Sequence, residues 1–254
     1  MAWYWILAIA IGAVGIFFLL SIIFYKQFFK RFYDIVLSFI ALVIFSPLLL
    51  ILTIATAIAM KGNPFFTQKR PGKKGRDGEE KIFRLIKFRT MTNEKDNLGN
   101  LLPDAERLKG YGEFLRKTSL DELPELLNIF VGNMSIVGPR PLLIRDMVFM
   151  TEEQRMRHSI RPGLTGLAQV NGRNAISWEE KLEFDVKYIQ KITLFRDVVI
   201  ILKTILKVLK HSDIVREGTV SDMDYGDWLL QELVITQTEY DTKQKEAEKW
   251  LNLE

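Results

Sequence analysis

The chain has 254 residues, with 35 Lys and Arg against 31 Asp and Glu, two histidines and no cysteine. This length suits one domain of ordinary size together with membrane segments. Without cysteine, the protein has no disulfide framework, thiol nucleophile or Cys-ligated zinc. His158 and His211 lie far apart in the sequence, which gives little support to a His-rich metal site or a His-based catalytic triad.

The charge is distributed unevenly along the chain. Residues 61–90 contain ten Lys and Arg and three acidic residues, whereas residues 211–254 are net acidic. A basic stretch is typical of proteins that bind nucleic acid or anionic lipid. Because this stretch follows a hydrophobic segment and contains no nucleic-acid recognition motif, we expect lipid and phosphate as partners and no nucleic acid.

The first hydrophobic segment, Trp3 to Phe24, contains no charged residue. At a rise of ~1.5 Å per residue it is long enough to cross the apolar core of a bilayer. Aromatic residues at both ends suit the two membrane interfaces. No basic stretch precedes the segment and no clear small-residue cleavage site follows it. We therefore predict a retained transmembrane anchor over residues 1–26, rather than a cleaved signal peptide.

The second hydrophobic segment, Phe32 to Met60, is predicted to enter the membrane and return to the same face. Basic residues precede it and the basic stretch follows it, so a full crossing would place one basic group outside, against the positive-inside tendency. Pro47 removes a helix hydrogen bond and can bend the helix, and the Ser46 hydroxyl can satisfy a freed carbonyl. We expect a re-entrant helix over residues 27–61, broken at Ser46-Pro47. A kinked but complete span is the alternative.

Residues 62–211 are predicted to form a compact catalytic domain that is mainly α-helical with a small β element. The stretch from Gly62 looks polar and irregular, and a short strand is expected at 81–88. Helices are expected at 104–117, from Ser119 or Asp121 to Phe130, at 177–191 after a capping box, and at 194–210. The last is amphipathic and suits the headgroup region, with packing on the soluble core as the alternative. Residues 212–254 are predicted to be an acidic tail with a short helix at 238–250.

Two adjacent carboxylates, Asp121 and Glu122, stand where a helix is expected to begin. Neighbouring helical side chains project about 100° apart, so the two can serve different tasks. One can attack phosphorus to form an aspartyl phosphate, while the other holds Mg²⁺, which prefers carboxylate oxygen. The alternative is structural: Asp121 caps the helix and Glu122 is solvated.

Nearby cations suit phosphate binding. Lys87 and Arg89 fall on one side of the chain if this stretch is extended, although a solvated strand face would look the same. Arg140 stands between two prolines whose φ angles are restricted, and Arg can bind phosphate with a two-pronged fork. Arg161 opens a glycine-rich loop, 161–173, which can surround a nucleotide but matches neither a P-loop nor a dinucleotide fingerprint.

The chain resembles the bacterial sugar transferase family, the monotopic polyprenyl-phosphate phosphoglycosyl transferases. It looks like a small member with an additional N-terminal hydrophobic segment. The resemblance covers roughly residues 28–210 and rests on motifs that occur in order: Lys30-Arg31 with Asp34, Ser46-Pro47, Gln68-Lys69-Arg70 with Gly72 and Gly75, Lys87-Phe88-Arg89-Thr90-Met91, Leu120-Asp121-Glu122-Leu123-Pro124, Gly138-Pro139-Arg140-Pro141, and Arg161-Pro162-Gly163-Leu164-Thr165-Gly166.

The resemblance implies a reaction. Family members move a sugar 1-phosphate from a nucleotide sugar, usually a UDP-sugar, to a polyprenyl phosphate such as undecaprenyl phosphate, and release UMP. By matching motif, Asp121 would be the nucleophile and Glu122 the ligand of Mg²⁺, with Mn²⁺ as the alternative metal. Ser46-Pro47 would break the re-entrant helix. Arg89 and Arg140 would belong to the phosphate-binding surroundings. Asp185 would be a further active-site carboxylate.

We therefore expect an enzyme on the cytoplasmic face of a bacterial inner membrane, which performs the first membrane step of exopolysaccharide, capsule, O-antigen or glycoprotein assembly. Its expected partners are a UDP-sugar, polyprenyl phosphate and the phospholipid bilayer, with a homo-oligomer and downstream glycosyltransferases as further candidates. Lys87, Arg89, Arg140, Arg161 and Asp185 are the predicted substrate-binding residues. One alternative is direct attack by the polyprenyl phosphate, with Asp121 as base. Another is a catalytically silent membrane scaffold.

Overall fold

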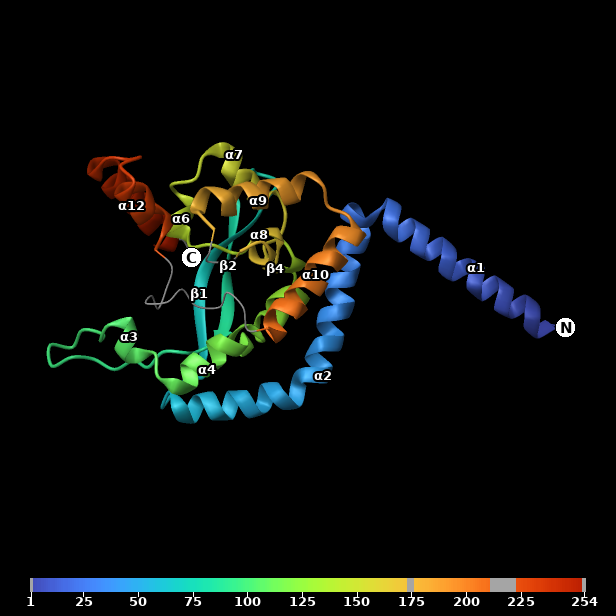
Figure 1. Cartoon of the computed structure of the whole chain (residues 1–254), viewed down its shortest axis with the longest axis horizontal. Helices are drawn as coiled ribbons and strands as arrows, with labels where there is room; N and C mark the ends of the chain where they lie inside the picture. The colour runs from blue at the N-terminus through green and yellow to red at the C-terminus, as the bar shows by residue number, and fades with distance from the viewer. Residues whose placement is uncertain (1, 173–175, 211–222, 253–254) are drawn as a thin grey trace.

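The computed structural model describes residues 2–172, 176–210 and 223–252. This part of the chain is mostly helical, with two small two-stranded sheets (Figure 1). Two long apolar helices come first, α1 (Ala2–Ile23) and α2 (Lys30–Ala59), joined by a π-helical turn, η1 (Tyr25–Phe29). Both are long and apolar enough to cross a membrane, in agreement with the two predicted hydrophobic segments.

Helix α1 projects away from the rest of the molecule (Figure 1). Its contacts are made near its C-terminal end. There, the Phe17 ring packs edge-on against the rings of Phe29 and Phe32, and Tyr33 donates a hydrogen bond to the Ser21 hydroxyl at 3.1 Å. Most side chains of α1 are exposed apolar groups, which suits surroundings of lipid.

Helix α2 is a single helix that bends near its middle (Figure 1). Pro47 lies inside it and has no N–H to donate to Val43 O, its partner one turn earlier. The Ser46 hydroxyl donates to this Val43 carbonyl at 2.8 Å. The predicted hydrogen bond from the Ser46 hydroxyl to the freed carbonyl is therefore confirmed. The break is milder than expected, because the helix bends without ending.

Both ends of α2 are attached to the same folded body. In its first turn, the Lys30 ammonium donates a hydrogen bond to Val137 O at 2.8 Å. In its second half, about two turns before its end, the buried Leu52 packs with Phe88 and Leu115. A helix of 30 residues is about 45 Å long when straight. The bend is therefore what allows both ends to reach one body.

The first sheet is an antiparallel hairpin of β1 (Phe65–Lys74) and β2 (Glu80–Phe88), in which Phe65 pairs with Phe88. The strand predicted at 81–88 is confirmed. The prediction of an irregular chain from Gly62 is wrong for residues 65–74. A β-strand is held by main-chain hydrogen bonds to its partner strand. The basic residues 65–74 can therefore form a strand although they show no apolar alternation.

Short elements follow the hairpin: α3 (Asp104–Arg107), α4 (Gly110–Thr118), a single 3₁₀ turn η2 (Leu120–Glu122) and α5 (Glu125–Val131). The helix predicted from Ser119 or Asp121 is wrong in its start, because α5 begins only at Glu125. Ser119 has a φ of +56°, in the left-handed region, which ends α4. The predicted helix over 104–117 is divided into α3 and α4.

The second sheet pairs β3 (Ser135–Val137) with β4 (Gly163–Thr165) in parallel. The connection between them contains three short helical elements, and a fourth follows β4: α6 (Ile144–Met147), α7 (Glu152–Arg155), η3 (Met156–Ser159) and α8 (Leu167–Val170).

Helix α9 (Trp178–Gln190) begins at the predicted capping box, in which Glu180 N donates to Ser177 Oγ at 3.1 Å. Its predicted apolar stripe is buried: Trp178, Leu182, Val186 and Ile189. In α10 (Leu194–Leu209), by contrast, the predicted apolar stripe is exposed: Val198, Leu202, Ile205 and Leu209. Packing on the soluble core is therefore wrong for these four residues.

Two further helices, α11 (Tyr225–Gln231) and α12 (Gln237–Asn252), pack against α6. The helix predicted at 238–250 is confirmed. Residues 212–222 of the predicted tail lie outside the described residues.

Candidate active site

The two predicted carboxylates lie in η2, between α4 and α5. The main chain turns sharply on both sides of them, at the left-handed Ser119 and at Pro124, which immediately precedes α5. Asp121 and Glu122 are therefore held in a short turn that belongs to neither neighbouring helix. Asp121 does not cap α5, so the predicted structural alternative for this residue is wrong.

The carboxylate of Glu122 joins two cations from distant segments. Its Oε1 accepts a hydrogen bond from Lys87 Nζ at 2.9 Å and another from Arg140 Nη2 at 2.9 Å. Lys87 comes from the end of β2, and Arg140 follows β3. Burial raises the pKa of Glu122, but the charges of Lys87 and Arg140 outweigh it and hold this pKa well below its usual range. Glu122 is therefore ionised at neutral pH.

Lys87 binds a second carboxylate that sequence reasoning missed. Its Nζ lies 3.0 Å from Oε1 of Glu125, which is buried at the start of α5. Burial, together with the charge of Glu122, raises the pKa of Glu125 to about 7, against the attraction of Lys87. Its spacing could have indicated this contact, because Glu125 follows Glu122 by three residues at the start of a helix, which places the two side chains near each other.

Asp121 differs from both glutamates, because no hydrogen bond to its carboxylate is formed by the described residues. Burial and the neighbouring charge of Glu122 raise the pKa of Asp121 to about 6, although Lys87, Arg116 and Arg140 oppose this. Above this pH, Asp121 is an ionised carboxylate with both oxygens available. These are the properties required of a nucleophile.

The carboxylates fit a divalent metal that is shared with a phosphate. Both cations contact Oε1 of Glu122, and Oε2 of this residue accepts no hydrogen bond from the described residues. Within that part of the chain, no group of three or more acidic, His or Cys residues is arranged as a metal site. Mg²⁺ often takes one or two carboxylates and completes its shell with substrate phosphate and water, so the residues present fit Mg²⁺ held in this way.

Two further arginines come from segments that adjoin this cluster in the chain. Arg89 follows Lys87 at the end of β2, where its N–H donates to Pro64 O at 2.8 Å. Its guanidinium forms no hydrogen bond or ion pair with the described residues. Arg116, which sequence reasoning missed, comes from the last turn of α4 and donates to Thr90 Oγ1 at 3.1 Å. Its charge lowers the pKa of Asp121.

The turn that carries Arg140 is packed closely against the start of β4. Gly138 N donates to Thr165 O at 2.8 Å, and Gly163 N donates to Pro139 O at 2.8 Å. A Cβ on Gly163 would lie 2.1 Å from Gly138 N, so a side chain cannot be accommodated there. The first residues of the predicted nucleotide loop, 161–173, therefore pack against the Arg140 turn and support it. Its last residue, Arg173, lies outside the described residues.

Asp185 is connected to this turn through Arg157, and its hydrogen bonds within the described part of the chain are not to Asp121 or Glu122. Its Oδ2 accepts hydrogen bonds from Arg157 Nε at 3.0 Å and Nη2 at 2.6 Å, and both side chains are almost completely buried. Arg157 Nη2 also donates to Arg140 O at 2.6 Å. Asp185 therefore supports the main chain of Arg140 through Arg157, a residue that sequence reasoning missed.

Arg161 lies at the opposite end of α5 from the carboxylate pair. Its Nε donates to Gly132 O at 2.7 Å, at the C-terminal end of that helix. There it accompanies Arg31, whose Nη1 donates to Ile129 O at 2.6 Å. The structure thus brings together Asp121, Glu122, Lys87 and Arg140, but not Arg161 or Asp185.

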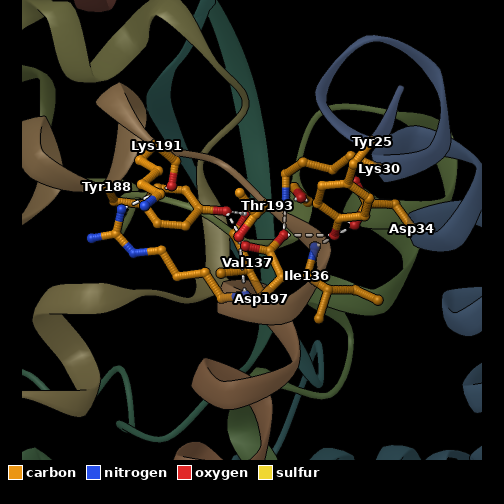
Figure 2. Close-up of polar contacts among 11 residues, drawn as sticks. Tyr25, Lys30, Asp34, Ile136, Val137, Tyr188, Lys191, Thr193 and Asp197 are labelled. Carbon is orange, nitrogen blue, oxygen red and sulfur yellow. Dashed lines mark hydrogen bonds and ion pairs between the residues drawn. The ribbon is translucent and has the colours of Figure 1, made fainter. Parts of the chain in front are cut away.

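A second polar cluster fastens β3, and hence the Arg140 turn, to the start of α2 (Figure 2). We call it the Asp197 hub. Asp197 Oδ2 accepts from Tyr25 at 2.7 Å and from Lys30 at 2.6 Å, while Oδ1 accepts from Tyr188 at 2.7 Å. Beside the hub, Asp34 Oδ1 accepts from the main-chain N–H of Ile136 in β3 at 2.9 Å. The membrane helix and the candidate site are therefore parts of one connected structure.

Comparison with known proteins agrees with the resemblance. The family model described as bacterial sugar transferase matches residues 25–211. The chain is 47% identical to the uncharacterized sugar transferase EpsL of Bacillus subtilis over 76% of this chain and 93% of EpsL. It is 37% identical to the exopolysaccharide production protein ExoY of Rhizobium meliloti over 69% of this chain and 83% of ExoY.

A longer relative has a name that states a reaction. The UDP-glucose:undecaprenyl-phosphate glucose-1-phosphate transferase of Klebsiella pneumoniae is 36% identical over 70% of this chain, which corresponds to 40% of that protein. The predicted resemblance is confirmed: the chain belongs to the bacterial sugar transferase family and is a transferase enzyme.

Proposed function

We propose that this protein transfers a sugar 1-phosphate from a UDP-sugar to a polyprenyl phosphate, with Asp121 as the covalent nucleophile. The reaction class is supported by the name of the Klebsiella relative. The covalent step is supported by one observation in particular. Asp121 has a carboxylate without hydrogen-bond partners among the described residues, beside a glutamate that is bound by Lys87 and Arg140.

In the first half-reaction, an Asp121 oxygen attacks the phosphorus that bears the sugar. A bond forms between this oxygen and phosphorus, the bond from phosphorus to the bridging oxygen breaks, and UMP leaves with the electron pair. The charges of Lys87 and Arg140 stabilise the negative charge that develops on the phosphoryl oxygens. This step needs no proton from the protein, because the phosphate of UMP is a good leaving group when its charge is neutralised.

In the second half-reaction, an oxygen of the polyprenyl phosphate attacks the same phosphorus. The bond to Asp121 breaks, the carboxylate is restored, and a polyprenyl diphosphate sugar is formed. Mg²⁺ held by Glu122 would supply additional positive charge to the phosphoryl oxygens. Splitting one displacement into two allows a water-soluble donor and a lipid acceptor to use one site in turn.

The membrane geometry supports access for the lipid acceptor. Because both ends of the bent α2 are attached to one folded body, we propose that α2 enters and leaves the same face of the membrane. The exposed apolar stripe of α10, with Lys203, Lys207 and Lys210 on the same helix or at its end, suits the headgroup region. The catalytic domain would then face the cytoplasm of a bacterial cell, where UDP-sugars are made.

The covalent step is tested by omitting the acceptor. Purified protein and Mg²⁺ are incubated with a panel of UDP-sugars, without polyprenyl phosphate, and UMP is measured. The proposal predicts release of about one UMP per enzyme with the correct sugar, and none with Asp121→Asn. A strict requirement for polyprenyl phosphate would instead support direct attack by the acceptor.

The topology is tested by labelling single cysteines, since the natural chain contains none. Lys26→Cys and Lys61→Cys place exposed thiols just before and just after α2. A membrane-impermeant maleimide added to sealed, oriented vesicles is expected to label both positions from the same side. Labelling from opposite sides would show that α2 crosses the membrane.

A further inference from the structure

The C-terminal segment, residues 223–252, lies outside the residues that match the family model but packs directly on the catalytic domain. It consists of α11, α12 and their connection. Figure 1 shows α12 beside α6, the short helix that follows the Arg140 turn. The described part of this segment is therefore not a free tail.

The segment completes the apolar core around α6. Ile144, Met147 and Val148 are almost completely buried, and they form one cluster with Ala247 of α12, against which Trp250 also packs. Helix α6 has only four residues, too few to be stable without tertiary packing. Its position, immediately after the Arg140 turn, therefore depends on the cover that α12 provides.

A carboxylate joins the segment to the end of the Arg140 turn. Asp146 is buried, and its Oδ2 accepts a hydrogen bond from Leu143 N at 2.9 Å, three residues after Arg140. Its Oδ1 accepts from Tyr225 N at 2.9 Å, in the first turn of α11. One side chain thus fixes the main chain beyond Arg140 and the start of the C-terminal segment together.

The segment also touches the hairpin that carries Lys87. The main-chain carbonyl of Leu251 accepts a hydrogen bond from Lys69 of β1 at 2.8 Å, and Ile82 of β2 packs on the cluster formed by α6 and α12. The segment therefore contacts both parts of the chain that supply a cation to Glu122. This arrangement links the spacing of Lys87 and Arg140 to the docking of α12.

We propose that residues 223–252 are a positioning element of the active site, which holds Arg140 in its place at Glu122 through Asp146 and the core around α6. The inference rests on the proposed function, because Arg140 is there assigned to the phosphoryl group. In this proposal, the position of Arg140 depends on residues that lie outside the family match at 25–211.

The test is a double-mutant cycle with Arg140. Asp146→Asn keeps one acceptor oxygen but replaces the other with an amide donor, and Asp146 itself is hydrogen-bonded to Leu143 N and Tyr225 N, not to Asp121 or Glu122. We expect Asp146→Asn to lower kcat/KM for the UDP-sugar about tenfold in the parent enzyme, measured as UMP release. In an Arg140→Gln background, the same change is expected to lower the remaining rate less than twofold. Equal losses in both backgrounds would mean that Asp146 acts independently of Arg140 and would overturn the proposal.

A second set of three variants separates positioning from folding. Trp250→Ala removes cover from α6, Trp250→Phe retains most of it, and Lys249→Ala changes an exposed neighbour on the same helix. Hydrogen exchange followed by mass spectrometry should show faster exchange in residues 142–150 for Trp250→Ala only. Unchanged exchange there would contradict the proposal. Hydrogen exchange needs no substrate. If the parent enzyme released no UMP, the proposed function would be contradicted, but the exchange measurement would still test the packing of α12 on α6.

Discussion

Two clusters of carboxylates and cations in this molecule differ in how completely their hydrogen bonds are formed. In the Asp197 hub, both oxygens of the buried carboxylate are bound, by Tyr188 on one side and by Tyr25 and Lys30 on the other. In the candidate site, Glu122 binds Lys87 and Arg140, but Asp121 beside it has no partner among the described residues. A satisfied network stabilises the fold, whereas a poorly solvated, unpaired carboxylate costs stability and is available for reaction.

The largest expected effect comes from removing the unpaired carboxylate. Asp121→Asn should lower turnover by a factor of about 10³ or more, because the nucleophile is lost. Since the pKa of Asp121 is raised to about 6 in the folded protein, its ionisation opposes folding above pH 6 and has little effect below about pH 4. The variant should therefore be more stable than the parent at pH 7.5, by on the order of 1 kcal/mol.

Thermal unfolding at pH 7.5 and at the lowest pH at which the protein remains soluble, combined with UMP release, would check both parts of this prediction. A variant with parental turnover would remove Asp121 from the chemistry. A lower Tm at pH 7.5 would show that the carboxylate stabilises the fold, and the contrast with Asp197 would be lost.

The opposite result is expected in the hub. Lys30→Met leaves Asp197 buried without its cation, and breaking such a pair costs about 3–5 kcal/mol. The free energy of unfolding in detergent should fall by this order. Tyr25→Phe is the milder companion, since it removes one hydrogen bond to Asp197, with an expected cost of about 1 kcal/mol. Losses below about 1 kcal/mol for Lys30→Met would show that the hub does not stabilise the attachment of α2.

Glu122→Gln should separate metal binding from nucleophilic attack. The amide is neutral and a weaker ligand for a hard cation, so activity at limiting Mg²⁺ should fall about 10–100-fold. Saturating Mg²⁺ should recover part of this loss. A Mg²⁺ titration that coincides with that of the parent enzyme would exclude Glu122 as the metal ligand.

The smallest effect is a pH dependence of the first half-reaction. Asp121 attacks as the ionised form, and its pKa is about 6, so UMP release should fall about tenfold per pH unit below this value. The rate measured in single-turnover conditions between pH 5 and 8 would reveal this limb, with thermal unfolding as the control for stability. A rate that stays constant down to pH 5 would show that Asp121 keeps an ordinary pKa.

Much of the site could be predicted from the sequence, because its chemistry is carried by short local motifs. The Asp-Glu pair, Lys87 and Arg140 were each recognisable from residue type, neighbouring proline or position. The Ser177 capping box and the role of Ser46 beside Pro47 also depend on residues only a few positions apart, and both were predicted correctly.

The remaining features depend on partners that are distant in the sequence. Strand β1 was missed because its basic residues show no apolar alternation, and the strand is defined by main-chain pairing with β2. Arg157 supports the Arg140 carbonyl, and Asp197 meets Lys30 of the membrane helix across the fold. Such contacts leave no periodic pattern in one sequence. Asp185 was predicted as a substrate-binding residue from the family resemblance alone, and its hydrogen bonds to Arg157, 28 residues earlier in the chain, could not be read from the sequence.

Mass spectrometry can detect the covalent bond that we propose between Asp121 and the sugar phosphate. Enzyme incubated with its UDP-sugar and Mg²⁺, without polyprenyl phosphate, is digested under acidic conditions that preserve acyl phosphates. Covalent catalysis by Asp121 predicts a mass increase of one sugar phosphate on the peptide that contains Asp121, which disappears when polyprenyl phosphate is added. A modified peptide from elsewhere in the chain, or no modified peptide in an enzyme that completes the full reaction, would contradict it.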